Sequence, residues 1–306
     1  MLKKSSFRRI IVTTTALLII ALIYLFPNND KHSYTTNLEY VNVEKTVVYL
    51  IDNNEYVART NIVLSEKELN AKVKQIIEAL TINGSKKAYI PNGFNAIIPK
   101  NTKLLDLSLD NGILKINFSK EFLNIEEDLE EKLIESIIFT LTEIEEVKQI
   151  MIFIEDNQLT TLPHSKKKLP PTLDRSFGIN KEYDLSSFKD TTKTTIYYLS
   201  KHNNNYYYVP VTKVSNDQSE KVEIIINALK SAPIYQTNLI SYLATNAELL
   251  NYEILENSIN LSFNNYILYD FENKQILEEV KYAIYLSVKD TYNISEISFI
   301  VDNETI

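Results

Sequence analysis

The chain has 306 residues, of which 44% are apolar and 24% charged, a composition that suits about two folded domains. Its formal net charge of −8 disfavours nucleic acid as a partner, because a field of that sign repels phosphate backbones. The sequence contains no cysteine, which excludes disulfides, thiolate nucleophiles, cysteine-ligated metals and a lipid-modified anchor.

The N-terminal region has the pattern of a membrane anchor. Residues 10–26 are uncharged and strongly apolar, and as a helix they would span roughly 25 Å, close to the ~30 Å hydrocarbon core of a bilayer. Four basic residues precede this run: Lys3, Lys4, Arg8 and Arg9. Because basic flanks stay in the cytoplasm, we predict a cytoplasmic tail at 1–9, a single-pass transmembrane helix at 10–26, a spacer at 27–45 and extracytoplasmic domains beyond. A cleaved signal peptide is the alternative, but the run ends without a small-x-small site.

The region after the spacer contains an internal repeat. Three segments of the first half recur in the same order in the second half: 46–50 as 195–199, 73–80 as 222–229, and 101–118 as 246–263. Such ordered recurrence predicts a duplicated domain. We place the copies at 46–157 and 193–306, joined by a linker or domain tail at 158–192 that is rich in proline and lysine.

Each copy is predicted to open with two short strands and a helix. In the first copy the β-rich runs are 47–51 and 56–63. Apolar residues then recur at helical spacing over 69–80. Ser65 is the expected N-cap of this helix, with Glu68 completing a capping box.

A hairpin follows, and one of its faces is predicted to be buried. Asn111-Gly112 supplies the turn, and this dipeptide is the strongest short-range hairpin signal. The alternating residues expected to point inward are Leu105, Leu107, Leu109, Leu114, Ile116 and Phe118, with Leu250, Tyr252, Ile254, Ile259, Leu261 and Phe263 in the second copy. Burial of each such side chain would stabilise the fold by about 1.5–3 kcal/mol.

A second helix and a last strand complete each copy. Apolar residues recur every four positions from Leu129 to Leu141, and apolar strands follow at 149–154 and 296–301. We therefore predict an α+β protein with two tandem ββαββαβ domains behind the transmembrane helix. In each domain two helices should pack on one face of a mainly antiparallel or mixed sheet.

The residue patterns of an enzyme are missing. The three histidines, His32, His164 and His202, lie in the predicted spacer, the linker and a turn, and none has a partner at metal-ligand spacing. The carboxylates clustered at 126–131 are typical of a solvated helix face. No glycine-rich phosphate loop occurs among the four glycines. We therefore predict no enzymatic activity, no catalytic or metal-binding residue and no cofactor.

Tyr206, Tyr207 and Tyr208 form the sharpest aromatic cluster. In a strand these side chains alternate between faces, so at least one should point away from the core. Ordinary β-propensity is the simpler explanation of the cluster. The functional alternative is a protein-contact surface, since tyrosine is enriched at the centre of interfaces.

Several segments resemble the GerMN domain family. In the first copy these are IIPKNTKLL at 97–105, DNG at 110–112 and INFSKEF at 116–122. The segment LDRSFGIN at 173–180 resembles the tail after the first domain in GerM sporulation and germination proteins. The resemblance covers roughly 45–302 and is weaker in the second copy, where Asn257 replaces Gly112.

This resemblance implies a fold similar to the ring-building modules of secretion systems, and no catalysis. It implies a membrane-anchored scaffold that supports the channel complex between mother cell and forespore. The expected partners are sporulation channel components of the SpoIIIA/SpoIIQ type, and contact with the membrane would be through residues 10–26. Two alternatives stay open: an extracytoplasmic modulator of a signalling system, and a ligand- or cell-wall-binding module.

Overall fold

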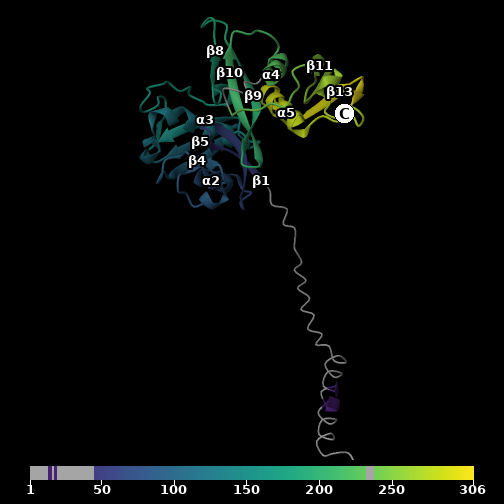
Figure 1. Cartoon of the computed structure of the whole chain (residues 1–306). Helices are drawn as coiled ribbons and strands as arrows, with labels where there is room; N and C mark the ends of the chain where they lie inside the picture. Colours follow the sequence, from purple (N-terminus) through teal and green to yellow (C-terminus); the bar gives the residue numbers. More distant parts are fainter. Residues whose placement is uncertain (1–12, 16, 19–44, 232–237) are drawn as a thin grey trace, which may run out of the picture. The chain divides into compact units, whose positions relative to one another are not determined.

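The computed structural model describes residues 13–15, 17–18, 45–231 and 238–306 (Figure 1). Most of the predicted transmembrane segment 10–26, and the predicted spacer except for Lys45, lie outside the described residues. Within the described part of the chain, no helix is both long and apolar enough to cross a bilayer.

The first copy contains the predicted order of elements with two very short strands added. Its elements are β1 (Lys45–Asp52), β2 (Val57–Val63), α2 (Leu69–Leu80), β3 (Phe94–Asn95), β4 (Leu104–Asp110), β5 (Ile113–Phe118), α3 (Glu130–Leu141), β6 (Gln149–Ile154) and β7 (Asn157–Gln158). Short 3₁₀ turns lie at 87–89, 120–123 and 127–129. The predicted strand at 149–154 coincides with β6, so the apolar alternation located it correctly.

The second copy repeats this order. Its elements are β9 (Thr192–His202), β10 (Asn205–Ser215), α4 (Lys221–Lys230), β11 (Leu249–Ile254), β12 (Ser258–Phe263), α5 (Glu278–Tyr292), β13 (Glu296–Val301) and β14 (Glu304–Thr305). One further strand, β8 (Glu182–Asp184), precedes it. The α+β class is therefore confirmed.

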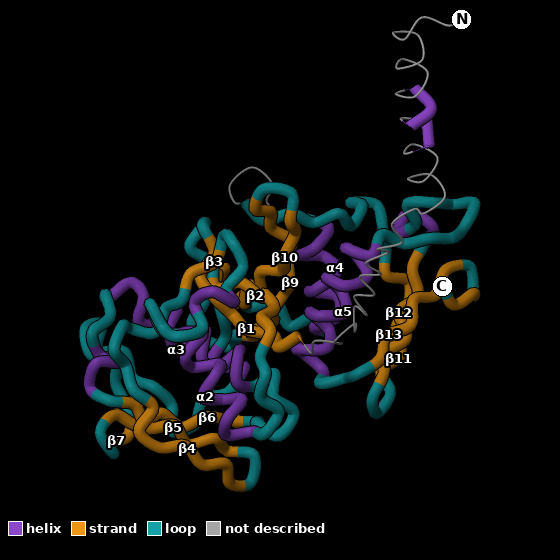
Figure 2. The backbone as a smooth tube through the Cα atoms, turned by 90° about the horizontal axis from the view of Figure 1, so that it is seen from below, coloured by secondary structure: helices purple, strands orange, loops and turns teal. Residues whose placement is uncertain are grey.

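The prediction of one sheet per copy, covered by helices on one face, is wrong. The opening hairpin of each copy and its later strands belong to different sheets, β4-β5-β6-β7 and β11-β12-β13-β14 being separate from the hairpins. The helices lie between the hairpin and the later sheet, as Figure 2 shows for both copies. The physical reason is visible in α3, where every residue from Leu133 to Leu141 is buried. A helix that is buried all round needs a partner layer on each side.

The two opening hairpins join into one sheet. The strands pair in the order β3-β1-β2-β10-β8. In addition, β10 pairs with β9 along its whole length. The contact between the copies is antiparallel and pairs Arg59 of β2 with Tyr208 of β10. Each copy thus contributes its first two strands to a shared layer.

Of the twelve positions predicted to be buried in the hairpins β4–β5 and β11–β12, the six on β5 and β12 are buried, three on β4 and β11 are half-buried and three are exposed. Leu105, Leu250 and Ile254 are 47%, 63% and 43% exposed. A β-bulge follows Leu104 in one copy and Leu249 in the other, and it shifts the alternation by one residue at Leu105 and Leu250. Ile254 lies beyond the bulge, at the end of β11, and the bulge does not account for its exposure. Leu104 and Leu249 take the inward positions instead.

Two local predictions have different outcomes. Asn111 and Gly112 have φ angles of 49° and 79°, as a tight hairpin turn with two left-handed residues requires. The predicted N-cap at Ser65 is wrong. Glu68 caps α2, because its carboxylate accepts hydrogen bonds from the backbone N–H groups of Asn70 and Ala71.

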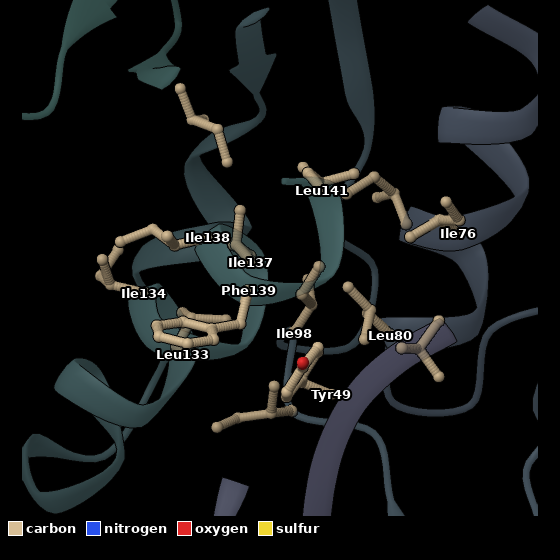
Figure 3. Packing of buried hydrophobic residues seen from close by; sticks show 14 of the residues in the cluster. Tyr49, Ile76, Leu80, Ile98, Leu133, Ile134, Ile137, Ile138, Phe139 and Leu141 are labelled. Atoms are coloured by element: carbon tan, nitrogen blue, oxygen red, sulfur yellow. The ribbon is translucent and has the colours of Figure 1, made fainter. Parts of the chain in front are cut away.

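The first core forms where both helices meet β1. Figure 3 shows side chains of α3 gathered with Ile76 and Leu80 of α2 around Ile98 and Tyr49. The rings of Tyr49 and Phe139 meet edge to face with centroids 5.5 Å apart. This packing places the Tyr49 hydroxyl group near the end of α3, where it becomes part of the junction between the copies.

Residues 158–192 are not a simple linker, since this segment packs against both copies. Leu162, Leu169, Leu173 and Ile179 are buried in the first core. Further along, β8 pairs with β10 in parallel orientation. The prolines of the segment favour a spacer, but its buried apolar side chains hold it against the first domain.

Candidate functional site

The most concentrated group of charged and polar side chains lies where the two copies meet, around Arg175. The Arg175 guanidinium donates to Glu143 Oε1 at 2.7 Å and also pairs with Asp290 of α5. It further donates to the Phe139 carbonyl oxygen at 3.2 Å and to the Tyr197 hydroxyl oxygen at 3.3 Å. The Arg175 side chain is only 23% exposed, so the tail between the copies supplies a largely buried cation to both of them.

Two tyrosines complete this cluster. Tyr49 donates its hydroxyl hydrogen bond to Glu143 at 2.9 Å, and its hydroxyl oxygen lies 3.0 Å from that of Tyr197. Burial alone would raise the pKa of Glu143, but the Arg175 and Arg59 cations outweigh it and hold this pKa below its ordinary value. Burial raises the pKa of both tyrosines. At neutral pH the cluster therefore contains charged Arg175 and Glu143 beside two neutral phenols.

The cluster is suited to joining the copies rather than to chemistry. Its charged groups already bond to one another, and a paired acid and base would need one carboxylate in an apolar pocket open to substrate. No group of three or more metal-ligating side chains occurs among the described residues. Two of the three histidines lie in the described part of the chain. The backbone N–H of His164 donates to the Glu130 carboxylate, and Nδ1 of His202 lies 3.2 Å from Nδ2 of Asn53.

Asn180 makes a second connection between the copies. Its side-chain amide donates to the carbonyl oxygens of Val57 in β2 and Pro210 in β10, at 2.8 Å and 2.7 Å. Its side-chain oxygen accepts from the Val57 N–H at 2.9 Å. The neighbouring Lys181 pairs with Glu135 on α3 at 2.5 Å. One short stretch of the tail thus contacts both hairpins and the first core.

The three tyrosines predicted as a contact surface lie in different environments. Tyr206 is 44% exposed, and its hydroxyl oxygen accepts from that of Tyr242 at 3.1 Å. Tyr207 is buried. Tyr208 is half-buried, and its ring meets that of Tyr282 edge to face at 5.1 Å. The alternation of faces holds, and Tyr206 is the member of the three that is most accessible to a partner.

Tyr207 connects the copies at a third point. Its hydroxyl group donates to Asp52 Oδ2 at 2.8 Å, and the other oxygen of Asp52 accepts from the N–H groups of Asn54 and Tyr56. Burial raises the pKa of Tyr207 to about 12, and the Asp52 carboxylate acts in the same direction. A residue predicted as a surface contact therefore holds the two hairpins together.

An exposed apolar cluster lies on the outer side of the second copy. Leu250, Tyr266 and Phe271 are 63%, 54% and 59% exposed, and they line a hollow of about 640 Å³. The repeat alignment places Glu121 of the first copy opposite Tyr266. Leu250 corresponds to Leu105, which is also exposed, so the aromatic ring at the position of Tyr266 is what distinguishes the second copy here. No sequence pattern separated this surface from ordinary core residues.

Comparison with known proteins identifies the class of fold first. The Germane family, described as sporulation and spore germination, matches residues 47–160. The solved structure of the tandem GerMN domains of the sporulation protein GerM from Bacillus subtilis aligns with a TM-score of 0.78 at 29% identity, covering 86% of this chain and 92% of that one. The fold is thus that of tandem GerMN domains.

A curated relative identifies the family to which the chain belongs. The spore germination protein GerM of Bacillus subtilis (strain 168) is 30% identical over 266 residues, which cover 84% of this chain and 71% of that protein. The chain belongs to the GerM family of sporulation and germination proteins. This confirms the resemblance seen in the sequence.

Proposed function

We propose that this protein is a membrane-anchored, extracytoplasmic scaffold that supports the channel complex between mother cell and forespore. Residues 10–26 would provide the anchor, and channel components of the SpoIIIA/SpoIIQ type would be the partners. Membership of the GerM family supports a role in sporulation and germination. The scaffold role is our inference from the surfaces of the two domains.

One observation carries this proposal: the apolar cluster of Leu250, Tyr266 and Phe271 on the second copy. Exposed apolar side chains grouped around a hollow are typical of protein-binding surfaces, and aromatic residues dominate binding energies there. The first copy has a glutamate at the position of Tyr266, so the copies are not interchangeable as docking modules.

The Arg175 cluster supports the same proposal in a different way. It joins the two copies through charged hydrogen bonds to Glu143 in one and Asp290 in the other. A scaffold requires that its binding surface be held by a stable body. We infer that the first copy and the tail support the second copy, which makes the contact.

The test is affinity capture of the tagged full chain from sporulating cells, with the bound channel components quantified by mass spectrometry. The variant combines Leu250→Ser, Tyr266→Ser and Phe271→Ser. Loss of most of the captured channel components is expected, because the apolar anchors are gone. The matched control is Phe188→Ser, which alters a side chain 95% exposed elsewhere, in the tail. Circular dichroism verifies that all variants fold.

Two results would oppose the scaffold role. The first is unchanged capture by the triple variant, which would place the contact elsewhere. The second is normal sporulation after deletion of the gene, together with recovery of no channel component. Recovery of a sensor kinase instead would favour the signalling alternative.

A further inference from the structure

The two copies differ in how the edge of their last strand is covered. In the first copy, four apolar residues form a row across the sheet. Leu109 pairs with Leu114, and Leu114 pairs with Ile150 of β6. The fourth member, Leu173, comes from the tail and pairs antiparallel with Ile150. Both Ile150 and Leu173 are buried as a result.

The second copy has the same row without its fourth member. Ile254 pairs with Ile259, and Ile259 pairs with Ile297 of β13. No described residue pairs with Ile297 on its outer side. The consequence is visible in the exposure, since Ile150 is fully buried whereas Ile297 is half-buried.

The backbone of Ile297 is oriented to accept a further strand. In the first copy the N–H of Gln149 bonds inward to Gly112, and the next residue, Ile150, exchanges two outward bonds of 2.8 Å with Leu173. In the second copy the N–H of Glu296 bonds inward to Asn257 in the same way. Because bonding directions alternate along a strand, the N–H and C=O of Ile297 must point outward. The chain after β13 covers only the far end of this edge: β14 pairs with Ile300 and Val301, and the Ile306 N–H donates to the Phe299 carbonyl oxygen at 2.9 Å.

We infer that the outer edge of β13 at Ile297 binds an extended strand from a partner protein. An exposed strand edge with unpaired N–H and C=O groups is a template for such strand addition. The first copy shows the required geometry, because its own tail occupies the same edge. This inference deepens the scaffold role and rests on it for the biological identity of the partner.

The side chains around Ile297 define the chemistry of the bound strand. The residue opposite Ile297 should be leucine or a similar apolar residue, as Leu173 is opposite Ile150. In the first copy, Asp174 follows Leu173 and accepts a hydrogen bond from Gln149 at 3.2 Å. The second copy has the exposed Glu296 at the place of Gln149, and its negative charge favours a basic side chain on the residue opposite. The partner strand should therefore have an apolar residue followed by lysine or arginine.

The same reasoning favours a partner over a second copy of this chain. Antiparallel pairing of two β13 strands about Ile297 would place Glu296 opposite Ser298 and would leave the carboxylate without an opposite charge. The formal net charge of −8 also opposes self-association. A partner strand with a basic residue would place a positive charge opposite Glu296, and the net negative charge of this chain would attract it.

The experiment measures binding of a synthetic peptide to the full chain in detergent. The peptide has the sequence of residues 168–176, in its natural form and in the Asp174→Lys form. We expect the lysine form to bind with a Kd below about 1 mM and about two- to fivefold more tightly than the natural form, as one exposed ion pair allows. In the Glu296→Lys protein this preference should reverse.

The Ile297→Pro protein provides the backbone control. Proline removes the N–H donor and is tolerated on edge strands, so both peptides should lose binding while circular dichroism stays unchanged. If that variant does not fold, the reversal by Glu296→Lys still decides the question. The inference is overturned if neither peptide binds at millimolar concentration, or if the preference does not respond to Glu296→Lys. It is also overturned if the edge instead mediates a dimer seen by sedimentation and abolished by Ile297→Pro.

The peptide experiment and the capture experiment test the strand edge and the scaffold role separately. Failure of peptide binding, with capture of channel components intact and sensitive to the Leu250, Tyr266 and Phe271 changes, would refute the edge alone. Peptide binding with no captured channel component would refute the channel role and leave the edge as a binding site.

Discussion

Tyr49 and Tyr197 come from the two different copies, and their hydroxyl oxygens lie 3.0 Å apart at the junction between these copies. Each donates its backbone N–H, at 2.9 Å, to a hydroxyl group on the second helix of its own copy, Thr140 for one and Ser287 for the other. The two residues are thus structurally equivalent. The repeat in the sequence pairs Tyr49 with Tyr198 instead, one residue further on, so only the structure sets this register.

Replacing Arg175 by alanine should destabilise the protein strongly. The substitution would leave Glu143 and Asp290 as largely buried carboxylates without their cation, a loss that typically costs about 3–5 kcal/mol. Urea denaturation followed by circular dichroism measures the change. The comparison is Lys281→Ala, which removes an exposed ion pair with Glu278 and should change the free energy of unfolding by less than about 1 kcal/mol. Similar effects of the two substitutions would contradict the role given to Arg175.

Neighbouring tyrosines of β10 should respond differently to loss of their hydroxyl groups. Tyr207→Phe removes a buried bond to the Asp52 carboxylate and should cost about 1.5–3 kcal/mol of stability. Tyr206→Phe removes an exposed bond to Tyr242 and should stay within about 0.5 kcal/mol of the wild type. Chemical denaturation of both variants tests this. A larger loss for Tyr206→Phe than for Tyr207→Phe would contradict the role given to the bond between Tyr207 and Asp52.

The order of elements could be predicted from the sequence because each hairpin and helix has its own local pattern. The arrangement of these elements in layers could not be predicted in this way. The apolar spacing from Leu129 to Leu141 indicates a helix, but it does not reveal that α3 is covered on both sides. The exposure of Leu105 and Leu250 was also missed, because a β-bulge shifts the alternation without any glycine to mark it.

The junction between the copies was beyond sequence reasoning for a different reason. Arg175 and Asn180 bond to residues far away in the chain, and such contacts leave no spacing pattern. One signal was present in the tail at 173–180, where Arg175 and Asn180 lie close to the apolar Leu173, Phe177 and Ile179, beside two further polar residues. Polar residues in such a setting often satisfy buried groups. The resemblance of this segment to the tail of GerM proteins indicated that the segment matters, but it did not show which bonds Arg175 and Asn180 make.

Amide hydrogen exchange should distinguish the two last strands. The Ile150 N–H donates to Leu173 and is buried, so it should exchange slowly. The Ile297 N–H has no described acceptor, and it should exchange at least about tenfold faster in the absence of a partner. Exchange measured by NMR on the full chain tests this without any substitution. Equal protection at the two positions would show that the β13 edge is already occupied.

The stability of the protein should depend on pH through Glu143. Its pKa in the folded state lies below the ordinary carboxyl value, since Arg175 and Arg59 outweigh the effect of burial. The folded state therefore binds this proton less readily than the unfolded state. The stabilisation is fully present above the ordinary carboxyl pKa of about 4.3 and is lost as the pH falls through the lower folded value. The difference in unfolding free energy between wild type and Glu143→Gln should thus be largest near pH 7 and shrink below about pH 4.

The matched control for this titration is Glu55→Gln. The Glu55 side chain is 85% exposed and lies 3.9 Å from Lys132, so its replacement should give a small difference that hardly changes with pH. Denaturant unfolding at a series of pH values measures both variants against the wild type. A difference for Glu143→Gln that stayed constant down to about pH 3 would mean that the carboxylate charge contributes nothing. Glu143 would then act only through the shape of its hydrogen bonds, and the cation of Arg175 would be held mainly by Asp290.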